Sequence, residues 1–68
     1  MKSKVVSSMI DELEYKGGKL FVTFPNGSTY QYDAPEEEYH NILNADSPGS
    51  YFSKNVKYKY KYVNVTDM

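Results

Sequence analysis

The sequence has no cysteine, no arginine, no tryptophan and no long run of apolar residues. Without cysteine there can be no disulfide framework and no thiolate metal site, and nothing indicates secretion. The first four residues include two lysines, but no apolar run follows them. Neither a signal peptide nor a membrane-spanning helix is predicted, so we expect a cytoplasmic protein with no membrane partner.

The chain is also short, at 68 residues. A domain of this size buries about 60% of the surface that its unfolded chain exposes, so its core is small and a partner subunit would stabilise it. One domain is the most that this length allows. We expect it to span residues 5–63, with flexible ends at residues 1–4 and 64–68.

The charge of the chain is unevenly distributed, although its formal net value is only −1. Residues 1–53 carry four lysines against eight acidic residues, whereas residues 54–68 carry four lysines against Asp67 alone. All eight basic residues are lysines, which lack the planar fork with which arginine grips phosphate or guanine. Any anion would therefore be bound by ammonium charges and backbone amides.

The strongest structural signal is the Asn26-Gly27 pair between two runs of β-branched and aromatic residues, 21–24 and 29–32. Asn-Gly readily takes the positive φ angles of a tight type I′ turn, so the two runs predict a β-hairpin. Tyr30 and the tyrosine two residues later share one face of its second strand.

Residues 8–15 precede this hairpin and alternate imperfectly between polar and apolar. We expect a strand with a bulge or twist near Asp11 and Glu12, and a helix is the competing interpretation. A Gly-Gly turn at residues 16–19 then joins this strand to the hairpin. Together these segments predict a three-stranded antiparallel meander, preceded by a mobile or weakly paired arm at residues 1–7.

Helical signals follow the hairpin. Pro35 suits a first helical position, and three glutamates come directly after it, where the helix dipole favours negative charge. Tyr39, Ile42 and Leu43 form an apolar stripe at helical spacing, so a helix is predicted over residues 35–44.

Ser47 and Pro48 repeat this start signal and predict a second, short helix over residues 48–55. Residues 56–65 then alternate tyrosine with lysine or valine, which is typical of a half-buried strand. That strand would join the meander or add to the sheet edge of another chain. The expected fold class is α+β: a three-stranded antiparallel meander, two short helices and a possible fourth, C-terminal strand.

The order of these features resembles the KTSC domain family. The resemblance covers about residues 5–60 and is carried by Ser7-Ser8-x-Ile10, Tyr15, the Asn-Gly hairpin ending in Tyr30-Gln31-Tyr32, Pro35, Tyr39, the run Ala45-Asp46-Ser47-Pro48-Gly49-Ser50-Tyr51-Phe52, Val56 and Tyr60. The family is named for the C-terminal extension of some lysyl-tRNA synthetases, and that association implies RNA binding. The segment after Tyr60 runs past the family's usual end.

Aromatic residues are the first candidates for ligand binding, since the chain has eight tyrosines and three phenylalanines. Tyr30 and Tyr32 could stack bases as the sheets of RNA-recognition modules do, but we favour a core role for them under the first helix. In residues 54–62 lysines interleave with tyrosines. This run fits a nucleic-acid surface, and equally an edge strand whose lysines prevent aggregation.

The start of the second helix offers small residues and backbone amides that suit an anion. Ordinary helix capping by Ser47 is the interpretation we favour there. His40 lies four residues after Glu36, but a metal needs more ligands than this pair provides. We expect no metal, no cofactor and no catalysis, because the chain has no cysteine, no partner set around His40 and no phosphate-binding loop.

We therefore expect a small non-catalytic binding module for RNA or a nucleotide-like anion. The candidate binding residues are Ser47, Gly49, Ser50, Tyr51, Lys54, Lys57, Tyr58, Lys59 and Lys61. The alternative is a protein-interaction module or small inhibitor. It would act by pairing its tyrosine- and lysine-rich C-terminal strand with a partner, or with a second copy of the chain.

Overall fold

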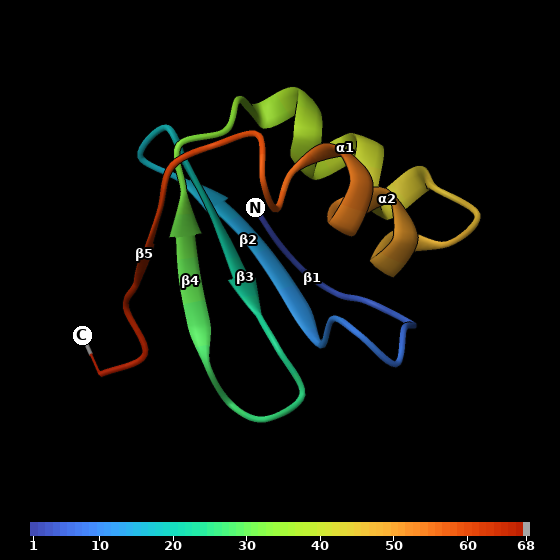
Figure 1. Cartoon of the computed structure of the whole chain (residues 1–68), viewed down its shortest axis with the longest axis horizontal. Coiled ribbons are helices and arrows are strands. Elements are labelled where there is room, and N and C mark those ends of the chain that lie inside the picture. Colours follow the sequence, from blue (N-terminus) through green and yellow to red (C-terminus); the bar gives the residue numbers. More distant parts are fainter. Residues whose placement is uncertain (68) are drawn as a thin grey trace.

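A five-stranded antiparallel sheet carries two helices on one face (Figure 1). This architecture comes from a computed structural model that describes residues 1–67. The strands follow one another across the sheet in sequence order, and the helices come between the last two: β1 Lys2–Lys4, β2 Glu12–Lys16, β3 Lys19–Thr23, β4 Thr29–Tyr32, α1 Glu36–Asn44, α2 Pro48–Asn55 and β5 Tyr62–Asn64. Within residues 1–67, neither helix has the length and apolar character needed to cross a membrane.

The central hairpin is confirmed, with β3 and β4 paired through Val22 and Tyr30, but its turn differs from the predicted type I′. Gly27 has a φ of 91°, whereas Asn26 has no positive φ. The Gly27 N–H donates to the Phe24 carbonyl at 2.9 Å, and the Phe24 N–H donates to the Ser28 carbonyl at 2.8 Å. This pattern is typical of a type I turn followed by a left-handed glycine, in a three-residue loop.

The geometry expected at Asn-Gly occurs instead in the turn between β2 and β3. Gly17 and Gly18 have φ angles of 58° and 78°, and the residues that flank them, Lys16 and Lys19, pair directly. Two consecutive positive φ angles in a two-residue loop are the requirement of a type I′ turn, which glycine meets without steric cost.

The N-terminal part adds a strand to the expected meander. Residues 2–4 of the expected arm pair with Glu12, Leu13 and Glu14 of β2. The competing helix for residues 8–15 is wrong, because Glu12–Lys16 is a strand. Ile10 and Leu13 are both buried despite their opposite parity, since Ile10 lies before the strand begins.

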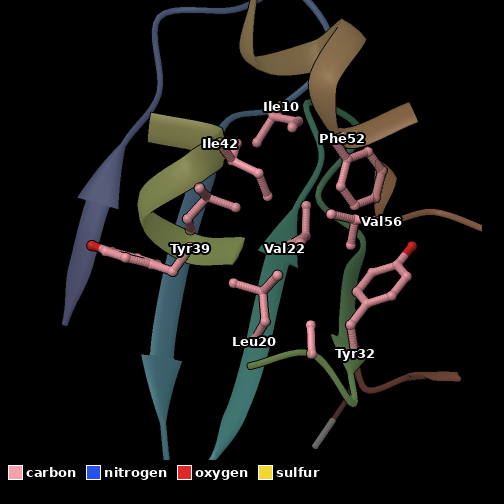
Figure 2. Packing of buried hydrophobic residues seen from close by; sticks show 10 residues of the cluster. Ile10, Leu20, Val22, Tyr32, Tyr39, Ile42, Phe52 and Val56 are labelled. Atoms are coloured by element: carbon pink, nitrogen blue, oxygen red, sulfur yellow. The ribbon is translucent and has the colours of Figure 1, made fainter. Parts of the chain in front are cut away.

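Both predicted helices are confirmed. Figure 2 shows Ile42 of α1 beside Val22 of β3, and the Phe52 ring of α2 meets that of Tyr32 of β4 edge-on, with centroids 5.4 Å apart. Apolar burial of this kind is the main favourable term in folding. The buried core consists of Ile10, Leu13, Leu20, Val22, Tyr32, Ala34, Tyr39, Ile42, Phe52 and Val56.

The predicted C-terminal strand is correct only over its final part. β5 covers Tyr62–Asn64 and pairs with β4, so the strand that was expected to join the meander is confirmed. Residues 56–59 form a turn. Val56 is fully buried, and its carbonyl accepts from the N–H groups of Lys59 and Tyr60 at 3.2 and 3.4 Å. Because of this turn, the alternating tyrosines and lysines before Tyr62 do not form a strand. Lys57, Lys59 and Lys61 therefore do not share a sheet face.

Gly49 is buried in the first turn of α2, where the chain around Met9 approaches it closely. A Cβ atom built on Gly49 would lie 2.8 Å from the Met9 Sδ and 2.9 Å from the Met9 Cβ. These distances are too short for non-bonded atoms, so glycine is required here for packing. This structural requirement accounts for a residue that the sequence also offered as a candidate for anion binding.

We expect Gly49→Ala to destabilise the protein by about 1 kcal/mol, because overpacking costs about 1–3 kcal/mol and the gain in helix propensity is only ~1 kcal/mol. Urea denaturation followed by circular dichroism measures this change. On a Met9→Gly background, which removes both the Sδ and the Cβ of this contact, the same substitution should become neutral or stabilising. An equal loss on both backgrounds would contradict the contact.

Candidate functional site

Five aromatic side chains and one lysine line a groove of about 250 Å³. The groove lies where β4 and β5 meet the turn that follows α2. Three separate parts of the chain supply its lining: the β3–β4 hairpin, the turn after α2, and β5. The lining residues are Phe24, Tyr30, Tyr32, Lys57, Tyr58 and Tyr62.

The pairing of β5 with β4 brings three tyrosine rings together. Tyr62 is the direct cross-strand partner of Tyr32, and Tyr30 lies two residues away on the same face. The Tyr62 ring centroid lies 5.6 Å from that of Tyr30 and 5.6 Å from that of Tyr32, with interplanar angles of 39° and 36°. Phe24 meets Tyr30 edge-on, with centroids 5.7 Å apart. Both arrangements are favourable for aromatic pairs.

These rings differ in their exposure to solvent. Tyr32 is 3% exposed and belongs to the core, as expected, whereas Tyr30 is partly buried. Burial, with Tyr62 and Tyr30 nearby, raises the pKa of Tyr32 to about 12, so its hydroxyl stays neutral at physiological pH. Tyr62 is 56% exposed and Tyr58 is 85% exposed. The last two rings are therefore the ones with faces that a ligand can reach.

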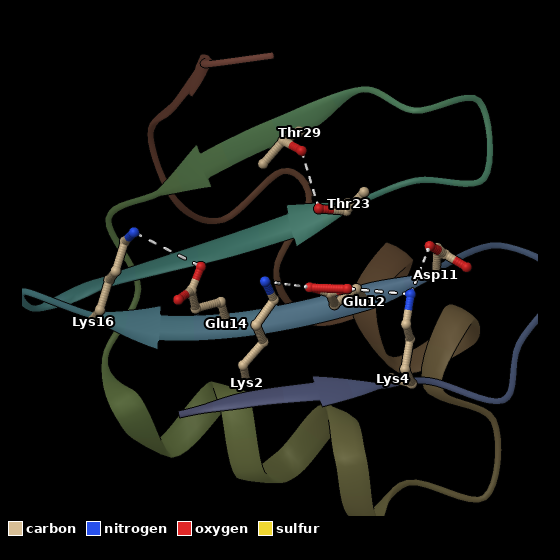
Figure 3. A network of polar contacts seen from close by, with 8 residues as sticks. All are labelled: Lys2, Lys4, Asp11, Glu12, Glu14, Lys16, Thr23 and Thr29. Carbon is tan, nitrogen blue, oxygen red and sulfur yellow. Dashed lines mark hydrogen bonds and ion pairs between the residues drawn. The ribbon is translucent and has the colours of Figure 1, made fainter. Parts of the chain in front are cut away.

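The eight lysines divide into two groups by their partners. Four lie within 4 Å of a carboxylate, among them Lys2 and Lys4, whose ammonium groups are 3.2 and 3.3 Å from Glu12, and Lys16, which is 3.9 Å from Glu14. Figure 3 shows these three pairs on the sheet face opposite the helices. The fourth, Lys19, pairs with Asp33.

The other four lysines, Lys54, Lys57, Lys59 and Lys61, form no ion pair with any carboxylate in residues 1–67. We refer to them as the C-terminal lysine group. The Lys57 ammonium lies 5.4 Å from the centroid of the Tyr58 ring, and that of Lys59 lies 5.4 Å from the Tyr60 ring. Positive charge beside the groove is therefore not neutralised within the described chain.

A buried carboxylate, Glu38, joins α1 to the segments around the groove. Its Oε1 accepts from the Tyr51 hydroxyl at 2.6 Å and from Asn41 Nδ2 at 3.1 Å, and its Oε2 accepts from the Tyr60 hydroxyl at 2.9 Å. Burial opposes ionisation of this group. The three hydrogen bonds and the nearby charge of Lys59 outweigh burial and lower the pKa of Glu38.

The structure brings Lys57 and Tyr58 into the groove lining, but not the other residues proposed from sequence. Lys54 lies in α2, Lys59 and Lys61 follow α2 in the chain, and none of the three lines the groove. Tyr51 donates its hydroxyl to Glu38.

Two serine side chains lie at the start of α2, where the sequence predicts an anion site. The Ser47 Oγ donates to the Ser50 Oγ at 3.1 Å and makes no capping bond to the backbone. Ser47 thus occupies the N-cap position that we favoured from sequence, but its side chain does not bond a backbone N–H of the helix.

His40 bonds Glu36 at 3.1 Å, and residues 1–67 contain no cluster of three potential metal ligands.

Sequence reasoning missed Phe24 and Tyr62 as lining residues. Phe24 stands at the mouth of the hairpin, and Tyr62 completes the tyrosine alternation. Alternation placed Tyr58 and Tyr62 on one strand face, whereas the structure places them on a turn and a strand that meet at the groove. The residues that line the groove can be recognised together only from the pairing of β5 with β4.

The fold defines a small α+β domain in which an antiparallel sheet is covered by two helices on one face. The KTSC domain model matches residues 6–62, so the chain belongs to the KTSC domain family, as the sequence resemblance predicted. The KTSC domain protein YPO2434 from Yersinia pestis, known from its crystal structure, is similar to it with a TM-score of 0.85 and 29% identity, over 96% of each chain. A search of curated proteins gives no match.

The lowered pKa of Glu38 predicts a pH-dependent contribution to stability. A carboxyl whose folded pKa lies below its ordinary value of 4.5 stabilises the fold above that pH, and the contribution is lost as the pH falls through the folded pKa. We expect Glu38→Gln to be less stable than the unsubstituted protein by about 1–3 kcal/mol at pH 7, and the difference to shrink on acidification below about pH 4.5.

Urea denaturation at a series of pH values between 7 and 3 measures this difference. Other titrating carboxyls, including Glu12, occur in both proteins and cancel. Glu37→Gln removes an exposed charge from the same helical turn and serves as the matched control. A stability difference that stays constant over the whole pH range would contradict the role of the ionised carboxylate.

Proposed function

We propose that this KTSC domain is a non-catalytic, cytoplasmic binding module that holds unpaired RNA in the aromatic groove. The observation that carries this proposal is the meeting of exposed Tyr58 and Tyr62 rings with Lys57. Aromatic faces stack on bases, and lysines attract the phosphate backbone. Both components of single-strand recognition therefore occur side by side.

The chemistry of the groove favours single strands. Bases within a duplex are already stacked, so only unpaired bases can present a face to a tyrosine ring. The lining offers ring faces, tyrosine hydroxyls and one ammonium group, without a side-chain amide or carboxylate. Stacking is tolerant of sequence because every base has a π-face. We expect binding with little base preference, and the groove to accept a nucleotide-like anion by the same contacts.

A cationic ligand is the natural competitor, because aromatic pockets also bind cations through their ring faces. Here Lys57 lines the groove, and the other lysines of the C-terminal lysine group lie within four residues of it in the chain. Within residues 1–67 no carboxylate pairs with these lysines. Like-charge repulsion therefore disfavours a cation and favours an anionic partner.

A protein partner is the second candidate. β5 lies at an edge of the sheet, and all three of its residues are exposed. An exposed edge strand can pair with a strand of another chain, including a second copy of this one. This reading would become the working hypothesis if RNA produced no response at low salt.

Charge removal tests the lysine component. We expect the triple variant Lys57→Gln, Lys59→Gln, Lys61→Gln to bind short single-stranded RNA more weakly, and to reduce the slope of log affinity against log salt by about 2. Each phosphate contact contributes roughly 0.7 to that slope for single strands. NMR titration of the labelled protein at low and moderate salt locates the response by residue.

The matched control replaces three paired lysines, Lys2, Lys4 and Lys16, with glutamine and so removes the same total charge. It should bind RNA nearly as well as the unsubstituted protein. Equal losses in the two triple variants would indicate diffuse attraction without a localised site. No loss in the first variant would remove the C-terminal lysine group from the binding surface.

Ring removal tests the stacking component. Because Tyr58 is 85% exposed, Tyr58→Ala should leave stability unchanged. It should weaken RNA binding by about tenfold, since stacking contributes roughly 1–3 kcal/mol per base. Tyr58→Phe keeps the ring and should bind normally, as measured by fluorescence polarisation of a labelled oligonucleotide. If both variants bound RNA equally, Tyr58 would not stack on a base.

A further inference from the structure

Glu38 is 4% exposed and is the one buried charged residue in the core of the described chain, residues 1–67. A buried carboxylate is costly unless it is fully hydrogen-bonded. Both of its oxygens are bonded, Oε1 to Tyr51 and Oε2 to Tyr60. One side chain of α1 thus fastens two other segments of the chain, α2 and the turn that leads to β5.

The second of these segments forms one wall of the groove through Lys57 and Tyr58, and we refer to these two residues as the wall. Residues 57 and 58, which line the groove, lie between two anchored positions. Val56 anchors one end through its buried side chain, and its N–H donates to the Phe52 carbonyl at 3.0 Å. At the other end the Tyr60 hydroxyl bonds Glu38, and the Lys61 carbonyl accepts from the Asp33 N–H at 2.9 Å.

We propose that Glu38 and Tyr60 are positioning residues for the groove, because the bond between them holds the wall, Lys57 and Tyr58, in place. Neither residue lines the groove, so each acts through the backbone of the turn. The part of this inference that concerns ligand affinity rests on the proposed function. The part that concerns the position of the wall holds for the free protein.

Comparison of the two tyrosines that bond Glu38 distinguishes a positioning role from a general effect on stability. Tyr51 and Tyr60 each donate one hydroxyl to the same carboxylate, at 2.6 and 2.9 Å. Tyr51 lies within α2, whose backbone is held by its own helical bonds. Tyr60 lies outside any helix or strand, two residues after Tyr58. Loss of the Tyr60 bond should therefore loosen the wall, whereas loss of the Tyr51 bond should not.

Tyr60→Phe and Tyr51→Phe are the matched pair that tests this proposal, since each removes one hydroxyl and keeps its ring. Amide hydrogen exchange is measured in the free protein at Lys59 and Tyr60, whose N–H groups bond the Val56 carbonyl. The ratio of these rates in each variant to those in the unsubstituted protein reports local opening of the turn, while amides of the central strand β3, measured in the same experiment, report any change in global stability.

We expect Tyr60→Phe to raise this ratio by about tenfold or more, a factor that corresponds to roughly 1.4 kcal/mol. Tyr51→Phe should leave it within about twofold. RNA affinity should fall about fivefold or more in Tyr60→Phe and stay near its original value in Tyr51→Phe. Glu38→Gln, which keeps the shape of the side chain without its charge, should behave as Tyr60→Phe does at the turn.

An equal exchange ratio in the two phenylalanine variants would overturn the proposal, because the hydroxyl of Tyr60 would then have no special effect on the wall. This readout needs no ligand. If the unsubstituted protein failed to bind RNA, the proposed function would fail, while the exchange ratio would still decide whether Glu38 and Tyr60 position the wall.

Discussion

A small antiparallel sheet must bury one of its faces, and this requirement determines most of the structure. Leu20 and Val22 of β3 are buried beneath α1, and Phe52 of α2 packs on Tyr32 of β4. Both helices come between β4 and β5 in the sequence, so the chain must return from α2 to the free side of β4. That return path contains the turn at residues 56–59 and ends in β5, and the groove lies where this path meets the sheet.

The same covering divides the surface of the sheet into two chemical environments. On the open face lysines and glutamates of β1 and β2 pair across the strands, as opposite charges do on neighbouring positions. On the helix side of β4 and β5 the rings of Tyr30, Tyr32 and Tyr62 gather, with lysines that lack carboxylate partners within residues 1–67. A chain with a net charge of −1 thereby presents a locally positive, aromatic surface.

Sequence patterns predicted the elements that depend on interactions between neighbouring residues. Pro35 and the stripe that includes Ile42 gave the first helix, and the Asn-Gly pair gave the hairpin, though not its turn type. The strand expected over residues 56–65 forms only at Tyr62–Asn64, because Val56 packs into the core and a further turn follows α2. Alternation cannot reveal such packing. The groove depends on the β4–β5 register, and the Glu38–Tyr60 bond joins residues 22 positions apart, so neither could be read from sequence spacing.

A buried carboxylate is a poor source of net stability, because the cost of removing its charge from water offsets most of what its partners return. An apolar residue at position 38 would fill the same space without that cost. An apolar residue could not accept hydrogen bonds, so it could not hold the hydroxyls of Tyr51 and Tyr60 at fixed positions. In a domain with so small a core, a directional contact between three segments restricts the arrangement of the turn more than apolar packing alone. The contribution of Glu38 is thus best explained by the geometry that its hydrogen bonds impose on the wall of the groove.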